Sequence, residues 1–244
     1  MLETAVALGF GHLLADFMMQ TNAMIRAKSR ITVLLLHIAI ITAVSWAALG
    51  FPLQPGLLLL IAVSHFAIDW AKLRFGGPGF GPFALDQAAH VAMIALGAAL
   101  FPGAYAAGLW SHAATSGLAG GLEWLPRAQA FAGGLVATVW AGGYAVKELM
   151  TGLKLPTDPG ADLPLGGQLI GRLERLMILM LLLANQPDGI GLLIAAKSIL
   201  RFNELARDTD RRASEYVIIG TLASFAWAIA TAWATASALD ALAP

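Results

Sequence analysis

Long apolar segments, separated by short polar or glycine- and proline-containing loops, make up most of this sequence. Eight segments can be distinguished, at residues 4–19, 32–49, 56–71, 86–107, 128–144, 169–183, 189–200 and 216–239. A helix needs about 20 mainly apolar residues to cross the hydrocarbon core of a bilayer. The sequence therefore predicts an all-α integral membrane helical bundle with about eight transmembrane or membrane-buried helices, of which the seventh is short for a full crossing.

The composition agrees with this class and excludes several others. Only 12% of the 244 residues are charged, whereas soluble domains carry about 25%. Fifteen Lys and Arg residues balance fifteen Asp and Glu residues, so no nucleic-acid partner is expected. The sequence contains no cysteine, which excludes disulfides, thiolate chemistry and zinc sites built from cysteine.

Basic residues alternate between the loops. The loops after the first, third, fifth and seventh segments contain Arg26, Lys28, Arg30, Lys72, Arg74, Lys147, Lys154, Arg201, Arg207, Arg211 and Arg212, whereas residues 51–55 and 185–188 contain neither Lys nor Arg. Because cytoplasmic loops carry the excess of Lys and Arg, we expect a bacterial cytoplasmic (inner) membrane protein with both termini outside. The first segment is not expected to be a signal peptide, because Glu3 precedes it and His12 and Asp16 interrupt it.

Proline and glycine mark two non-helical stretches. Residues 76–82 predict a tight cytoplasmic turn. Residues 151–168, with three prolines, predict a cytoplasmic linker between a five-span part at 1–150 and a three-span part at 169–244. Together these parts are expected to form one compact membrane domain.

Ionisable residues recur inside the apolar segments at a spacing of four. The pairs are His12 and Asp16, His65 and Asp69, and Asp86 and His90. This spacing places both members on one helix face. The third pair is reversed in a segment that runs in the opposite direction, so the three Asp should share one layer, with the three His about 6 Å deeper.

Imidazole and carboxylate groups that converge in a membrane predict a metal centre. These side chains suit zinc best and also iron or manganese. Six ligands are enough for one or two divalent ions, whose charge would offset the repulsion between the carboxylates. We therefore expect His12, Asp16, His65, Asp69, Asp86 and His90 to bind metal on the cytoplasmic side, with Asp69 and Asp86 also catalytic.

Two further histidines have weaker claims to this site. His37 lies at the depth of the histidine layer. A role in supporting the metal ligands, or a structural role, suits it better than direct binding of the metal. His112 is expected to be an ordinary residue of an outer loop. Two other interpretations of the cluster stay open, namely a structural hydrogen-bond network and a proton or ion path.

Four basic residues at the same membrane face are candidates for binding an anionic substrate group: Lys72, Lys197, Arg201 and Arg172. The positive-inside rule explains Arg172 and Arg201 equally well. Lys197 lies within an apolar run, where pairing with Glu174 and binding of a phosphate are equally consistent with the sequence.

Several local motifs resemble one known family. They are Gly11-His12-Leu13-Leu14-Ala15-Asp16-Phe17, His65-Phe66-Ala67-Ile68-Asp69 with Lys72, Asp86-Gln87-Ala88-Ala89-His90, Ile170-Gly171-Arg172-Leu173-Glu174-Arg175, Ala196-Lys197-Ser198-Ile199 and Glu215-Tyr216. In combination they resemble domain of unknown function 3307, which implies a bacterial multi-pass membrane protein. A more distant similarity, to membrane-bound metal-dependent hydrolases, rests on multi-span helices with intramembrane His and Asp.

These observations predict a metal-dependent intramembrane hydrolase with a cytoplasm-facing His/Asp site. Its substrate would be a membrane-embedded anionic molecule similar to a lipid phosphate, and its partner would be the lipid bilayer itself. A divalent-cation or proton transporter or channel using the same cluster is the first alternative. A non-catalytic membrane scaffold is the second.

Overall fold

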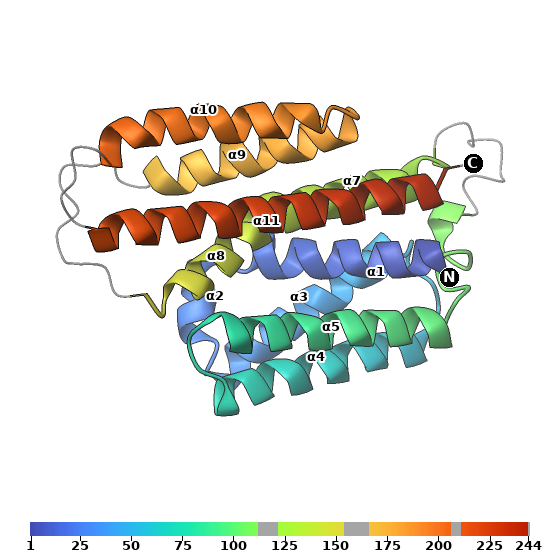
Figure 1. Ribbon diagram of the computed structural model, residues 1–244. Helices are drawn as coiled ribbons and strands as arrows, with labels where there is room; N and C mark the ends of the chain where they lie inside the picture. The colour runs from blue at the N-terminus through green and yellow to red at the C-terminus, as the bar shows by residue number, and fades with distance from the viewer. Residues whose placement is uncertain (112–121, 154–165, 206–210, 244) are drawn as a thin grey trace. The chain divides into compact units, whose positions relative to one another are not determined.

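A computed structural model describes residues 1–111, 122–153, 166–205 and 211–243, and in this part of the chain it contains helices and turns but no strand (Figure 1). The α-helices are α1 Leu2–Leu14, α2 Asn22–Ala27, α3 Ile31–Ala48, α4 Pro55–Phe75, α5 Phe80–Leu100, α7 Leu125–Val136, α8 Gly142–Met150, α9 Gly166–Leu183, α10 Asp188–Leu205 and α11 Arg211–Ala241. Two π-helical turns, η1 Ala15–Met19 and η2 Ala137–Ala141, continue α1 and α7. The predicted all-α class is confirmed.

Five helical stretches are long and apolar enough to cross a membrane: Leu2–Met19, Ile31–Ala48, Pro55–Phe75, Phe80–Leu100 and Ser214–Ala241. The predicted number of about eight spans is not confirmed. One physical reason lies in α9, whose 18 residues contain the charged Arg172, Glu174 and Arg175. Another lies in the α7–η2–α8 run, where Gln129 and several glycines dilute the apolar character.

The fourth predicted segment differs from the helix that the structure contains. Helix α5 begins at Phe80, so Gly81 and Pro82, predicted to lie in a turn, form its first turn. Proline is tolerated there because the first N–H groups of a helix have no partner within the helix. At the other end, residues 101–107 form turns, since Pro102 and Gly103 do not favour continuation of a helix.

The chain divides into two compact units. Unit 1 comprises Met1–Val136 and Ser237–Pro244, and unit 2 comprises Ala137–Ala236. Only the two ends of the predicted linker at 151–168 are described, as the turn that follows α8 and the start of α9. The two units are described separately below.

Helix α1 is the central helix of unit 1. Its buried residues follow one helix face, at Thr4, Ala7, Leu8, Gly11 and His12. This face brings α1 into contact with α3, α5 and α7, while α3 packs on α4 and α4 on α5. The apolar core of unit 1 forms at the end of α1 opposite η1, around Leu8, Leu49 and Leu57.

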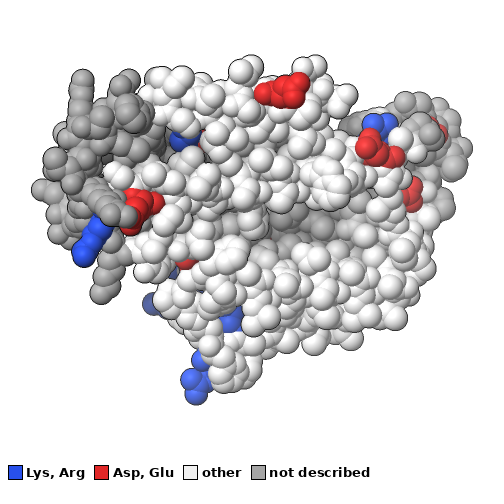
Figure 2. Space-filling view, in the orientation of Figure 1, with Lys and Arg blue, Asp and Glu red and all other residues white. Residues whose placement is uncertain are grey.

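Helices α4 and α5 carry their histidines and aspartates on the buried face. In α4 the buried residues include His65 and Asp69, whereas the exposed fractions of Leu59 and Val63 are 65% and 57%. The surface along α4 and α5 is uncharged over most of its length, with Lys or Arg only at one end (Figure 2). A helix with polar groups inside and apolar groups outside is suited to lipid and not to water.

A glycine allows α1 and α3 to approach closely beside the first histidine. A Cβ atom on Gly11 would lie 2.9 Å from the Cα and 3.0 Å from the Oγ of Ser45 on α3. Small residues at such contacts let membrane helices pack backbone to backbone. The contact at Gly11 therefore fixes the position of His12, the next residue.

Unit 2 contains a buried arginine that binds neutral groups. Arg175 of α9 donates from Nη2 to the carbonyl of Val139 in η2, at 2.8 Å, and from Nη1 to Ser224 Oγ, at 3.1 Å. A Cβ on Gly142 would lie 2.9 Å from Arg175 Cδ, so this glycine makes room for the arginine. Arg175 thus joins three helical segments of unit 2.

Replacing Gly11 with alanine should destabilise the protein, because the new methyl group overlaps the backbone of α3. We expect the free energy of unfolding in detergent to fall by about 1–3 kcal/mol, measured by denaturant titration. Gly9→Ala is the matched control, since no atom lies within 4 Å of a Cβ at that position. That control should be neutral or slightly stabilising. Equal effects of the two substitutions would contradict the close contact at Gly11.

Candidate metal centre

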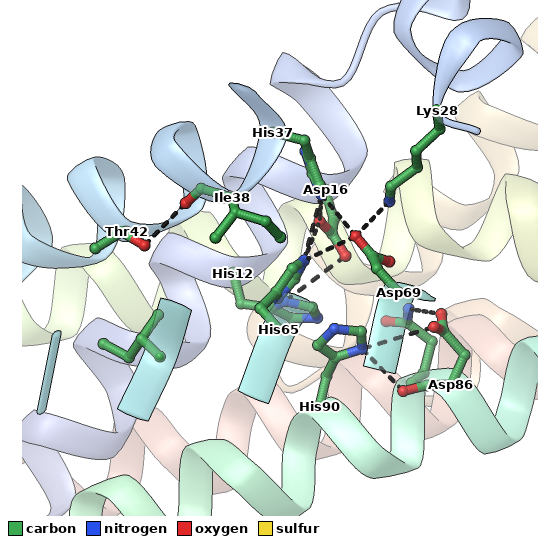
Figure 3. Close-up of polar contacts among 12 residues, drawn as sticks. His12, Asp16, Lys28, His37, Ile38, Thr42, His65, Asp69, Asp86 and His90 are labelled. Carbon is green, nitrogen blue, oxygen red and sulfur yellow. Dashed lines mark hydrogen bonds and ion pairs between the residues drawn. The ribbon is translucent and has the colours of Figure 1, made fainter. Parts of the chain in front are cut away.

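Four histidines and three aspartates of unit 1 come together from five helical elements (Figure 3). They are His12 of α1, Asp16 of η1, His37 of α3, His65 and Asp69 of α4, and Asp86 and His90 of α5. All six residues that the sequence predicts as metal ligands belong to this cluster. Six of the seven are buried, and Asp16 is nearly so, with 10% of its side chain exposed.

The reversed motif on α5 faces the motif on α4. The ring centroids of His65 and His90 are 4.2 Å apart. Ligand atoms of Asp69, Asp86 and His90 lie within 4.8 Å of one another. Two helices that run in opposite directions can match histidine with histidine and aspartate with aspartate only if one sequence motif is reversed. The predicted convergence of these two pairs is therefore confirmed.

Asp16 enters the cluster from a π-helical turn. Its Oδ1 lies 3.1 Å from His37 Nε2 and 3.5 Å from His65 Nε2. A π turn holds one more residue than an α turn and is frequent at functional sites. Here the turn begins at Ala15 and marks the point where the regular inner face of α1 ends. Its position beside the cluster indicates a constraint imposed by the site.

His37 lies inside the cluster and contacts residues of two neighbouring elements. Its Nε2 is 3.3 Å from His65 Nε2 and 3.5 Å from Asp69 Oδ2, and its side chain is 1% exposed. The sequence indicates only that His37 lies at the depth of the other histidines. The structure adds that its helix, α3, turns this residue inward together with Leu34, Ile38 and Ile41.

Two lysines offset the charge of two of the carboxylates. Lys28 Nζ lies 2.7 Å from Asp69 Oδ2, and Lys72 Nζ lies 2.7 Å from Asp86 Oδ2. With neutral imidazoles, three carboxylates and two ammonium groups leave a charge of −1. The cluster can therefore accept one divalent cation or one proton without a large excess of charge.

Lys28 is a site residue that the sequence does not single out. In the sequence it is one of several basic residues of a loop, and nothing distinguishes it from Arg26 or Arg30. In the structure it follows the short helix α2, which Thr21 caps at its N-terminus through a 3.2 Å bond from Met24 N. Only 14% of the Lys28 side chain is exposed.

His90 and His12 each present one ring nitrogen that has no partner. His90 Nδ1 lies 2.9 Å from the carbonyl oxygen of Asp86, so it carries the proton and leaves Nε2 with a free lone pair. His12 Nδ1 faces the carboxylate of Asp16, at 3.7 Å. The Nε2 atoms of both rings are buried and form no hydrogen bond with the described residues. Metal-binding histidines are typically oriented in this way.

A narrow cavity of about 30 Å³ lies against the histidines. His12, His65 and His90 form its polar wall, together with Ser45 and Ser64. The rest of the lining is apolar: Leu8, Ile41, Leu60, Ile61, Met93, Ile94 and Gly97. Neither Lys nor Asp is among these residues. Going away from the cavity, the histidines therefore come first, then the aspartates and then the lysines, as expected for separate His and Asp layers.

The remaining predicted site residues belong to unit 2 or are not described. Lys197 pairs with Glu174, at 2.5 Å, which is one of the two roles the sequence allows. Arg172 is exposed on α9, and Arg201 lies in α10 with a side chain outside the described part of the structure. His112 lies outside the described residues.

Comparison with known proteins gives one match. Residues 5–114 match the family model described as a protein of unknown function, DUF3307. This segment contains all seven residues of the cluster and both lysines, so the resemblance is confirmed for the part of the chain that carries the site. The motifs between residues 170 and 216 lie outside the match. No curated protein and no solved structure matches the chain.

Replacing Lys28 with methionine should destabilise the metal-free protein, because Asp69 would keep a buried charge without its ammonium partner. We expect the free energy of unfolding, measured with a chelator present, to fall by about 3 kcal/mol. Arg26→Met, at an exposed position of the preceding helix, should change it little. The double variant Lys28→Met/Asp69→Asn should lose less than the sum of the single variants. Additive losses would show that the two residues do not interact.

Proposed function

We propose that the protein is a metal-dependent intramembrane hydrolase whose site faces the cytoplasm. It acts on a membrane-embedded anionic substrate similar to a lipid phosphate. The metal is divalent, with zinc the first choice and iron or manganese also suitable, and one or two ions are bound by His12, Asp16, His65, Asp69, Asp86 and His90.

The observation that carries this proposal is that three buried imidazole nitrogens, His12 Nε2, His37 Nδ1 and His90 Nε2, have no hydrogen-bond partner among the described residues and lie in a cluster with three carboxylates. A buried polar atom without a partner costs about 1–3 kcal/mol. Burying ionisable groups between membrane helices costs more, and such residues usually mark function. A cation bound at these atoms would offset both costs.

The proposed chemistry divides between the metal and the protein. When bound, the cation supplies a water nucleophile that is deprotonated near neutral pH. Asp69 or Asp86 accepts the proton of that water. The oxygen of that water would bond to the phosphorus as the bond between the phosphorus and the leaving oxygen breaks, and the leaving oxygen would take up the proton held by the aspartate.

Basic residues supply the proposed affinity for an anionic group. Lys72 lies beside Asp86, and 41% of its side chain is exposed, so it can reach both the carboxylate and a bound anion. Lys197, Arg172 and Arg201 of unit 2 are further candidates for this role. Ammonium and guanidinium groups both form charge-assisted hydrogen bonds with phosphate oxygens.

The proposed location is the bacterial cytoplasmic membrane, with both termini outside. In unit 1 the end of η1, the start of α3, the end of α4 and the start of α5 lie at one end of the helices (Figure 1). This end contains Arg26, Lys28, Arg30, Lys72 and Arg74, whereas residues 49–55 and 101–111 contain neither Lys nor Arg. The positive-inside rule places the basic end in the cytoplasm.

Proton or divalent-cation transport by the same cluster is the second candidate. The contact between His37 and His65, at 3.3 Å, favours it, because adjacent imidazoles can relay a proton. The apolar lining of the cavity beyond the histidines argues against it, since a transported ion needs polar groups along its path. A non-catalytic scaffold would rely on the Lys28–Asp69 and Lys72–Asp86 pairs alone.

Metal content is the first test of the proposal. We expect elemental analysis of the detergent-purified protein to give one or two equivalents of zinc, iron or manganese per chain. The variant His65→Ala/Asp69→Ala should lose this metal, because it removes a histidine ligand and a carboxylate of the same cluster. The control Asp188→Asn/Asp240→Asn, which changes two exposed aspartates, should retain it. A wild-type protein without metal, even after incubation with added cations, would refute the metal centre.

Activity is the second test. We expect the metal-loaded protein in lipid vesicles to release product from a phosphorylated lipid. Asp69→Asn should lower the rate at least 100-fold while leaving the protein folded, because general-base catalysis typically contributes 10²–10⁴-fold. Transport would be favoured instead if sealed vesicles with the wild-type protein accumulate cations without hydrolysis and His65→Ala abolishes this accumulation.

A further inference from the structure

The seven ionisable residues of the cluster are not equivalent as metal ligands. Asp69 and Asp86 already have ammonium partners at 2.7 Å, Lys28 and Lys72. A cation that binds one of these oxygens has to compete with a lysine tethered to the same chain. The imidazoles have no such competitor among the described residues, and neither has Asp16, whose carboxylate faces His12, His37 and His65.

Two of the histidines share the same orientation. In His12 and in His90, Nδ1 faces an oxygen of the aspartate four residues away on the same chain segment, namely the Asp16 carboxylate and the Asp86 carbonyl. In both, Nε2 is buried and has no partner among the described residues. The spacing of four therefore lets a residue one turn away orient each histidine, through the Asp16 side chain for His12 and through the backbone of Asp86 for His90.

His65 completes a set of three. Ligand atoms of His12, His65 and His90 lie within 4.8 Å of one another. Their ring centroids are 4.8, 4.2 and 5.7 Å apart. Three imidazoles bound to one tetrahedral zinc ion at 2.0–2.1 Å would have centroids about 5 Å apart. Small side-chain adjustments would thus bring the three rings to one ion.

The same three histidines, and neither His37 nor an aspartate, line the cavity. Catalytic zinc sites keep three protein ligands and leave the fourth position for water. A volume of about 30 Å³ holds roughly two water molecules, and Ser45 and Ser64 offer hydroxyl groups there.

We propose that His12, His65 and His90 form a three-histidine zinc centre whose open coordination position faces the apolar cavity. This inference rests on the proposed function and identifies which cluster residues bind the ion. The Asp16 carboxylate and the Asp86 backbone carbonyl then orient His12 and His90, whereas Asp69 and His37 lie outside the set of ligands.

Zinc affinity of single variants tests the ligand set. In the full-length protein in detergent, competition with a chromophoric chelator should show at least a 100-fold weaker affinity for His12→Ala and for His90→Ala. His37→Ala and Asp69→Asn are the matched controls, since each also removes a buried group of the cluster, and they should weaken affinity less than 10-fold. Thermal unfolding of each metal-free variant checks that it is folded.

The open position has its own test with cobalt as the probe. Cobalt(II) in the wild-type site should give a visible absorption spectrum that changes when azide is added. Leu60→Phe, which fills part of the cavity, should keep the cobalt spectrum and reduce the response to azide at least 10-fold. An unchanged response in this variant would place the open position elsewhere.

The outcomes separate this inference from the proposed function. If His37→Ala or Asp69→Asn loses zinc while His12→Ala and His90→Ala retain it, the three-histidine centre is overturned. A metal-dependent hydrolase would then be left in place. A wild-type protein that binds no zinc under any condition would overturn both. Loss of zinc only in His12→Ala, His65→Ala and His90→Ala would support both.

Discussion

Unit 1 depends on burying ionisable side chains on helix faces that pack against one another, while apolar faces point outward. Charged groups in a hydrocarbon environment cost several kilocalories per mole unless they are paired. The helices that carry such groups have to stay in contact with one another, so the cluster of His12, Asp16, His37, His65, Asp69, Asp86 and His90 dictates which faces of α1, α3, α4 and α5 meet. In a bilayer the lipid offers these groups no alternative partner.

The geometry of the site follows from how closely these helices approach. At Gly11 the backbone of α1 touches Ser45 of α3, and the next residue is His12. A larger residue at position 11 would hold the two helices apart by the width of a methyl group. Because metal ligands have to meet within a few tenths of an ångström, a glycine that carries no chemistry decides whether the imidazoles can share an ion.

The sequence predicts the convergence of the motifs because direction and spacing are both visible in it. His65 and Asp69 on a segment that runs one way, and Asp86 and His90 on the next, can match in only one arrangement. The role of Lys28 could not be predicted, since its pairing with Asp69 depends on the path of the chain through α2. The position of His37 could be predicted in depth but not in rotation about α3.

The fold was predictable to a similar degree. The apolar segments indicate where helices lie, but not whether each crosses a membrane. In α9 the side chains of Arg172, Glu174 and Arg175 interrupt the apolar run, and Arg175 is buried through hydrogen bonds to Val139 and Ser224. Hydropathy alone does not reveal that such a charge has partners in neighbouring helices.

The π-helical turn at Ala15–Met19 sets a strict limit on the length of this segment. Deleting one of its residues would convert it to an ordinary α-helix, which leaves the flanking chain almost in register but changes the direction in which the residues of the turn point. Asp16 would then leave its partners His37 on α3 and His65 on α4. A surface turn such as residues 51–54 can absorb a change in length. The same change within Ala15–Met19 is therefore incompatible with the site. Natural proteins that match the same family model should accordingly preserve the number of residues between the positions of His12 and Lys28.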